Sequence, residues 1–115
     1  MAYDEDLADR IRGLLAGEAA VSEQKMFGGL AFLMGGNMAV AASGQGGLLV
    51  RVDPATSDDL VATTPAEEMV MRGRPMQGWL RVAPESVTTD ADLRTWVDRG
   101  RSYAGSLPAK PPKKR

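Results

Sequence analysis

The feature that most constrains the fold is the stretch from Lys25 to Val52, where short apolar segments alternate with glycine-rich turns. The turns fall at residues 35–37, Gly-Gly-Asn, and at residues 44–47, Gly-Gln-Gly-Gly. Glycine and asparagine supply the positive φ angles that tight hairpins require. The pattern therefore predicts three consecutive antiparallel strands, over about residues 24–34, 38–42 and 48–52.

Helical patterns precede this meander, follow it, and recur near the C-terminus. The first places apolar residues along one stripe at helical spacing, with Asp4 or Asp6 as its cap. The second begins near Thr56, which we expect to cap a short helix. The third begins at Thr88 or Thr89. Its predicted buried stripe consists of Leu93, Trp96, Val97, Gly100 and Tyr103 or Ala104.

Two more strands are expected between the second and third helices, at residues 69–72 and 79–82, with a loop over residues 73–78. For the first of these strands a helix extending over residues 66–71 is the alternative. The order of elements is then α-β-β-β-α-β-β-α. Strands joined by short turns are antiparallel neighbours, so the sequence predicts a two-layer α+β domain with helices on one face of a five-stranded sheet. We expect this single domain to span residues 1–106 and the basic residues 107–115 to form a disordered tail.

Two residue types are missing, because the 115 residues contain neither histidine nor cysteine. Ser-His-Asp and Cys-His catalytic designs and thiolate zinc sites therefore cannot be built within one chain. No apolar run approaches the roughly 20 residues that span a bilayer, and the acidic N-terminus has no signal-peptide pattern. We expect a cytoplasmic domain that is not an enzyme, binds no cofactor or metal, and makes no membrane contact.

A small enzyme using carboxylate or arginine chemistry stays open as a minor alternative. Acidic pairs occur at residues 58–59, 67–68 and 90–92, but acids near a helix N-terminus commonly act as caps and first-turn residues. The glycine-rich segments match neither GxGxxG nor the Walker pattern, and neither leads into a helix. Hairpin or bulge geometry therefore explains them better than a nucleotide loop.

Residues suited to recognition are expected on the sheet. Arg51 and Arg81 lie on the strand face opposite the apolar alternation, so in neighbouring strands they would form a basic patch beside Trp79. Such a patch suits an acidic protein segment or a phosphate, and an ordinary solvent-facing surface is the alternative. With the Met-Phe-Gly-Gly segment added, the candidate contact residues are Met26, Phe27, Gly28, Gly29, Arg51, Arg72, Arg74, Trp79 and Arg81.

The net charge of −1 conceals an uneven distribution. Residues 1–100 carry 15 acidic and nine basic side chains, a net charge of −6, whereas residues 101–115 carry five basic side chains and no acid. A negative body has the wrong sign for a surface that holds DNA phosphates, but the tail would attract nucleic acid non-specifically. A nucleic-acid-associated regulator using the tail and the arginine face is therefore the alternative to a protein-binding module.

The segments Lys25–Gly29, Gly36–Met38 and Leu49–Val52, in this order and spacing, resemble the TfoX N-terminal-domain family of TfoX/Sxy competence regulators. Residues 73–76, Gly-Arg-Pro-Met, and 78–79, Gly-Trp, fit a stand-alone bacterial branch, and the resemblance covers about residues 5–105. It implies a fold similar to type III secretion chaperones, a shape that often forms homodimers. It also implies a regulatory role through an unidentified protein partner, and no catalytic residues.

Overall fold

The computed structural model describes residues 3–17, 21–26, 28–44, 46–71 and 73–108. The first half of the chain contains α1 (Glu5–Leu14), β1 (Val21–Met26), β2 (Gly29–Met34), β3 (Asn37–Ala42) and β4 (Leu48–Arg51). The second half contains α2 (Pro54–Thr63), β5 (Glu67–Met71), β6 (Arg74–Val82), a short 3-10 helix (Pro84–Ser86) and α3 (Asp90–Ser106).

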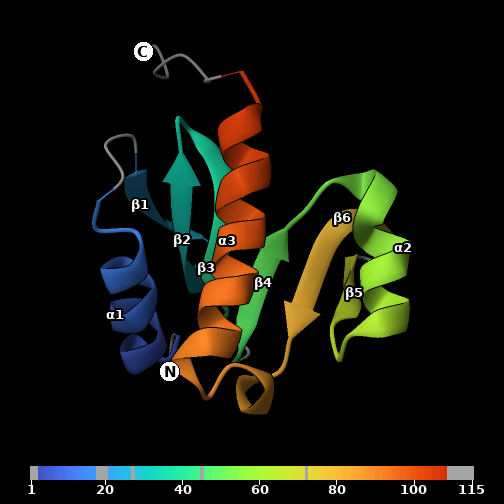
Figure 1. Cartoon of the computed structure of the whole chain (residues 1–115), viewed down its shortest axis with the longest axis horizontal. Helices are drawn as coiled ribbons and strands as arrows, with labels where there is room; N and C mark the ends of the chain where they lie inside the picture. Colours follow the sequence, from blue (N-terminus) through green and yellow to red (C-terminus); the bar gives the residue numbers. More distant parts are fainter. Residues whose placement is uncertain (1–2, 18–20, 27, 45, 72, 109–115) are drawn as a thin grey trace.

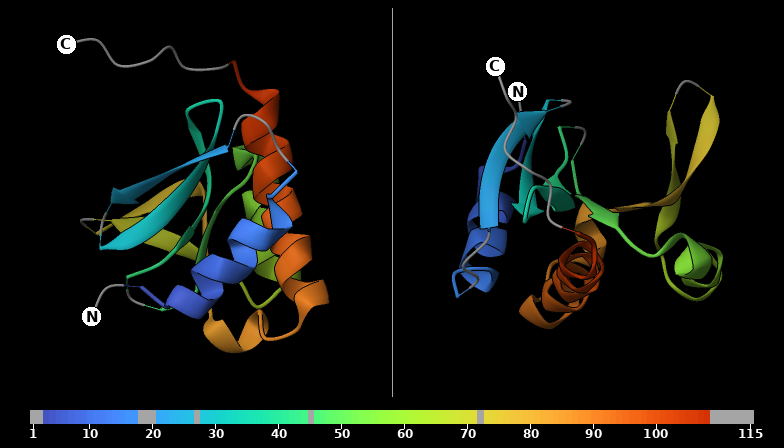
Figure 2. Two further views of the ribbon diagram at one scale, coloured as in Figure 1. Left: turned by 90° about the vertical axis from the view of Figure 1, so that its left-hand side faces the viewer. Right: turned by 90° about the horizontal axis from the view of Figure 1, so that it is seen from above.

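The strands form one sheet in the order β1-β2-β3-β4-β6-β5, and every pair of neighbours is antiparallel (Figure 1). The three helices lie along one side of this sheet. Viewed from above, β1 and the β5–β6 hairpin extend to the other side (Figure 2). The predicted α+β class, with helices on one face of an antiparallel sheet, is confirmed.

Alternate strand residues and the helix stripes meet in the main core, where burial of each large apolar side chain contributes about 1.5–3 kcal/mol. The strand residues in this core are Leu30, Phe32, Val40, Ala42, Leu48, Val50, Leu80 and Val82. The helix residues are Leu7, Ala8, Ile11, Leu93, Trp96 and Val97. In α3 the buried stripe ends at Ala104 rather than at Tyr103.

The number of strands differs from the prediction, because the expected strand over residues 24–34 is two strands. Met26 of β1 pairs with Gly29 of β2, so the chain reverses between them. Gly28 has a φ of 75°, a conformation that residues with a side chain rarely adopt. The adjacent glycines therefore make a turn, and the sheet has six strands rather than five.

The loop predicted over residues 73–78 is also wrong, because β6 already begins at Arg74. Proline lacks the N–H that a strand flanked on both sides must donate. Pro75 is tolerated because β4 pairs only with residues 79–82, which leaves β5 as the single neighbour of the first part of β6.

Two of the predicted helix caps are present and one is displaced. Asp4 caps α1 and Thr89 caps α3, each by accepting backbone hydrogen bonds. For α2 the cap is Asp53 and not Thr56, because the Asp53 carboxylate accepts from the Ala55 N–H at 2.9 Å and Pro54 suits the first helical position.

The predicted tail over residues 107–115 falls mostly on residues 109–115, which lie outside the described residues. Over the ranges that the structure does describe, no helix is both long and apolar enough to cross a membrane.

Candidate protein-contact surface

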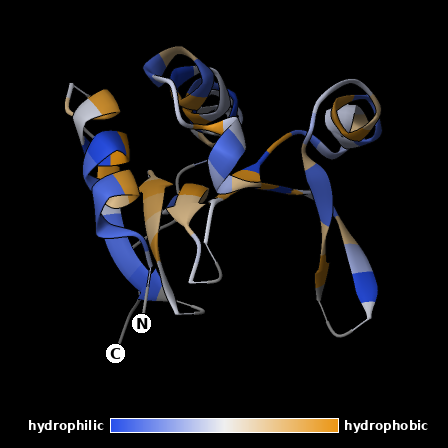
Figure 3. Cartoon of the chain, turned by 90° about the horizontal axis from the view of Figure 1, so that it is seen from below, coloured by the Kyte–Doolittle hydropathy of each residue, from blue (hydrophilic) through white to orange (hydrophobic). Residues whose placement is uncertain are grey.

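The side of the sheet that faces away from the helices carries a second apolar cluster. Ala31, Ala41 and Leu49 form a row across β2, β3 and β4, and Met38 lies beside this row. These four residues are buried, and the partly buried Leu33, Met69 and Trp79 pack around them. We call these seven residues the helix-free face, since no helix residue packs with them. Figure 3 shows the helices gathered on the opposite side of the sheet.

Arg51 lies at one margin of this face and is held between two aromatic rings. It pairs across β4 and β6 with Trp79, whose ring centre is 5.2 Å from the Arg51 guanidinium carbon. The ring centre of Tyr103 on α3 is 5.6 Å from the same carbon. Arg51 can reach α3 because β3 pairs with β4 only as far as Val50. Each cation–π contact of this kind contributes about 0.5–1 kcal/mol at an exposed site.

The structure brings Arg81 to the same region and leaves Arg74 apart. Arg81 on β6 pairs with Leu49 on one side and with Glu67 of β5 on the other, and its side chain is half-buried. Arg74 lies at the opposite end of β6, roughly 20 Å away along the strand. Arg72 lies outside the described residues. The basic group beside Trp79 is therefore formed by Arg51 and Arg81.

The glycines of the Met-Phe-Gly-Gly segment serve close backbone packing. A Cβ built on Gly44 would lie 2.5 Å from the Gly28 carbonyl oxygen, and one built on Gly29 would overlap the Ala42 carbonyl. The turn after β1 and the turn after β3 therefore pack backbone to backbone. Phe27 and the side chain of Met26 lie outside the described residues.

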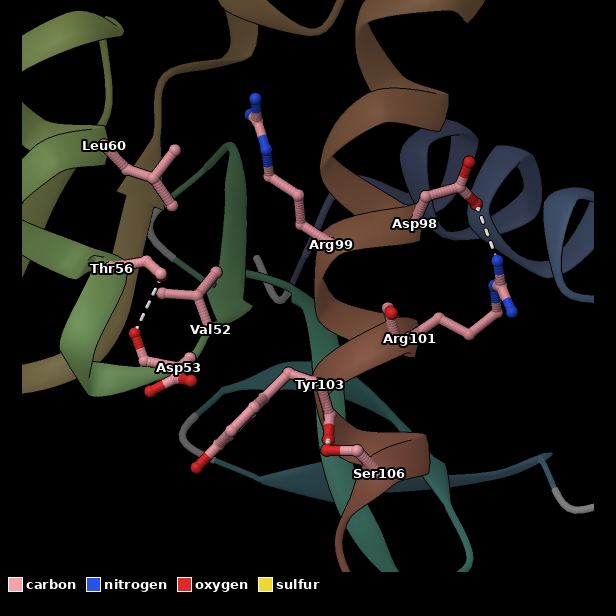
Figure 4. Close-up of a pocket in the computed structure, with 10 residues that line it drawn as sticks. Val52, Asp53, Thr56, Leu60, Asp98, Arg99, Arg101, Tyr103 and Ser106 are labelled. Carbon is pink, nitrogen blue, oxygen red and sulfur yellow. Dashed lines mark hydrogen bonds and ion pairs between the residues drawn. The ribbon is translucent and has the colours of Figure 1, made fainter.

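A groove of about 650 Å³ separates α2 from α3, and no sequence pattern indicates it (Figure 4). Arg99 and Tyr103 point from α3 toward α2, whereas Asp98 and Arg101 pair at 3.5 Å on the other side of α3. The groove is lined by Val52, Asp53, Thr56, Leu60, Asp98, Arg99, Arg101, Ser102, Tyr103 and Ser106. No motif could reveal it, because its two walls lie about 40 residues apart in the chain.

Arg51 connects this groove with the helix-free face. Tyr103 lines the groove and contacts Arg51, while Trp79, the other aromatic neighbour of Arg51, belongs to the helix-free face. Arg99 is a cation of the groove itself, and its guanidinium carbon lies 4.5 Å from the Trp96 ring centre. The two surfaces therefore meet at a cation held by aromatic rings.

A surface ion pair, remote from the groove, carries the clearest pKa shift. Arg12 of α1 donates hydrogen bonds to the Glu23 carboxylate of β1 at 2.6 and 2.9 Å. These bonds lower the pKa of Glu23 below its ordinary range. The pair joins α1 to β1.

The acidic side chains of the described residues form no candidate metal site. Over those ranges no group of three or more His, Cys, Asp or Glu side chains could hold a metal ion. Of the acidic pairs seen in the sequence, Asp90 and Asp92 lie in the first turn of α3, where they favour the helix dipole. Asp58 and Asp59 are exposed on α2.

Fold and surface together define a small two-layer α+β domain with an arginine-edged, helix-free sheet face. The TfoX N-terminal domain family matches residues 13–104, and the chain belongs to this family. The match runs from the end of α1 to the last turns of α3 and so includes the whole sheet. The family resemblance of the Met-Phe-Gly-Gly stretch is thereby confirmed. No curated protein and no solved structure matches the chain.

Proposed function

We propose that this domain is a regulatory adaptor that acts by binding an acidic segment of another protein. Membership of the TfoX N-terminal domain family supports a regulatory or adaptor role at the level of the family. The single observation that carries the choice of ligand is the position of Arg51, clamped between Trp79 and Tyr103 at the margin of the helix-free face.

The two ring contacts of Arg51 favour binding, because they reduce the conformational entropy that this side chain loses when a complex forms. An arginine side chain has several rotatable bonds, and ordering them opposes binding. Arg51 already contacts two rings, which restrict its rotamers, and its planar fork of N–H donors suits a carboxylate. A segment bearing acidic and apolar residues would place carboxylates on Arg51 and Arg81 and apolar groups against Leu33, Met69 or Trp79.

Fluorescence anisotropy of a labelled peptide of alternating glutamate and leucine tests this proposal. We expect the double variant Arg51→Ala/Arg81→Ala to lower the affinity of the domain for this peptide at least tenfold. Arg94→Ala is the matched control, because Arg94 is an exposed arginine on α3 outside the groove and the sheet face. Equal affinities of the double variant and the wild type would overturn the proposal.

Nucleic-acid binding is the second candidate, because five of the last 15 residues are basic. Labelled duplex and single-stranded DNA would be titrated with the full chain and with a truncation after Leu107, at low and physiological salt. Non-specific binding by the tail should vanish with truncation or with added salt. DNA binding that survives both changes and is lost in the double variant would assign the arginines to phosphate recognition instead.

A further inference from the structure

The two edge strands of the sheet differ in chemistry. Among the described residues, β1 and β5 each have a single strand neighbour. The middle of β1 is polar, and its residues 22–25, Ser-Glu-Gln-Lys, are all exposed. The middle of β5 contains Val70, which is 60% exposed and is the most exposed large apolar residue of the described chain. Charged edges resist pairing with another chain, and an apolar edge invites it.

We propose that β5 pairs antiparallel with β5 of a second copy of this chain, with Val70 on the two-fold axis. The backbone N–H and C=O groups on the outer side of β5 would then complete a ladder between the two copies. The sheet would run continuously from one copy into the other. Both helix-free faces would lie on the same side, because the axis is perpendicular to the sheet.

The distribution of charge along the β5–β6 hairpin favours a second copy of the chain as the strand that pairs with β5. Glu67 and Glu68 begin β5, and Arg74 follows the turn at its other end. A two-fold axis reverses the strand, so the acidic start of each copy lies beside the basic end of its partner. The β5–β6 hairpin, with Glu67 and Glu68 at one end of β5 and Arg74 of β6 beside the other end, is thus complementary to itself.

The same charges select the register. With Val70 opposite Val70, Glu67 of one copy lies opposite residue 73 of the other, next to Arg74. With Met69 on the axis, Glu67 and Glu68 would face Met71 and Val70 and would not reach the basic end. The acidic residues therefore place Val70, the most exposed apolar side chain, at the centre of the interface.

Disulfide trapping tests the register directly, because the chain has no cysteine of its own. Residues opposite each other in an antiparallel pair have Cα atoms about 4.5–5.5 Å apart. This separation lies within the range of about 4.4–6.8 Å that a disulfide requires. We expect Val70→Cys to form a covalent dimer at least tenfold faster under mild oxidation than Ser22→Cys. Ser22 is the matched control because it is exposed on the other edge strand.

Charge reversal distinguishes specific pairing from collision of exposed thiols. In the Val70→Cys background, Glu67→Lys should slow the cross-linking several-fold, and adding Arg74→Glu should restore it. Cross-linking of Val70→Cys that is no faster than that of Ser22→Cys, or that is insensitive to these charges, would overturn the proposal.

Sedimentation equilibrium of the unmodified chain gives a second, independent measurement. A short strand–strand interface belongs to the weak class, so the average mass should rise with concentration between about 10 µM and 1 mM. A mass equal to one chain throughout this range would also overturn the proposal. Neither measurement uses the acidic peptide, so failure of the dimer and failure of the proposed function are separable.

Discussion

Gly100 of α3 lies so close to Ala39 of β3 that a Cβ built on the glycine would be 2.5 Å from the Ala39 carbonyl oxygen. The same Cβ would be 2.7 Å from Cγ1 of Val40. The helix backbone therefore rests directly on the strand backbone at this point. This contact sets the depth at which the central helix sits on the sheet.

Replacing Gly100 with alanine should lower the free energy of unfolding by about 2 kcal/mol, since the added methyl group must displace backbone. Gly105→Ala is the matched control in the same helix, because nothing lies within 4 Å of its Cβ. That control should raise the free energy of unfolding by about 0.5 kcal/mol through helix propensity. Urea denaturation followed by circular dichroism measures both. A Gly100→Ala variant as stable as the wild type would contradict this packing.

The packed turns at the end of the sheet give a second prediction. Gly44→Ala should cost about 2 kcal/mol or more of unfolding free energy, because the new Cβ meets only backbone atoms of Gly28. Gly13→Ala in α1 is the control, since its Cβ would meet nothing within 4 Å. Thermal unfolding should show a clear drop for the first variant and none for the second. Equal melting temperatures would mean that the two turns do not touch.

The turn at Gly28 and Gly29 shows how much of the fold could be predicted from the sequence. The helix stripes were predictable because each follows the helical period, and so were the two faces of β4, where Leu48 and Val50 alternate with Leu49 and Arg51. The pattern could not show that two adjacent glycines would reverse the chain rather than bulge one strand. That choice depends on Gly44, which packs against the turn from a distant part of the sequence.

The start of β6 was missed for a related reason. Pro75 and Gly78 are ordinary signs of a loop, and sequence alone cannot tell that this part of the strand has one neighbour only. The contact surface was predictable in part, because strand alternation placed Arg51 and Arg81 on one face. The contact between Arg51 and Tyr103 was not predictable, since it requires β4 to extend beyond its pairing with β3.

Asn37 provides a third prediction because it is buried and holds the end of α3. Its side-chain amide donates to the Pro108 carbonyl at 2.9 Å, and only 4% of its surface is exposed. Asn37→Asp replaces the donor with an acceptor facing a carbonyl oxygen, which should cost about 1–3 kcal/mol. Hydrogen exchange should accelerate at residues 104–107 and stay unchanged in the first turns of α3. Equal exchange rates at residues 104–107 in the variant and the wild type would show that this bond does not hold the helix end.

The Arg12–Glu23 pair predicts a small dependence of stability on pH. Because the pKa of Glu23 is lowered in the folded protein, its stabilising contribution is present above the unfolded pKa of about 4.3 and is lost as the pH falls through the folded value. The difference in unfolding free energy between wild type and Glu23→Gln should therefore be constant from pH 8 to about pH 6. It should shrink once the pH falls below about 4.3.

Urea denaturation across this pH range measures that difference. The effect should be small, because both side chains are partly exposed to solvent. In the Arg12→Gln background, Glu23→Gln should show no such dependence on pH, since the hydrogen-bond donor is gone. A difference that grows as the solution is acidified would contradict the assigned cause.

The bond from Asn37 to Pro108 also fixes the point at which the described chain leaves the sheet and helix layers. Asn37 begins β3, a strand in the interior of the sheet, so the chain departs from an anchored point and not from a fraying helix end. A single side-chain amide thus ties the end of the helix layer to the interior of the sheet.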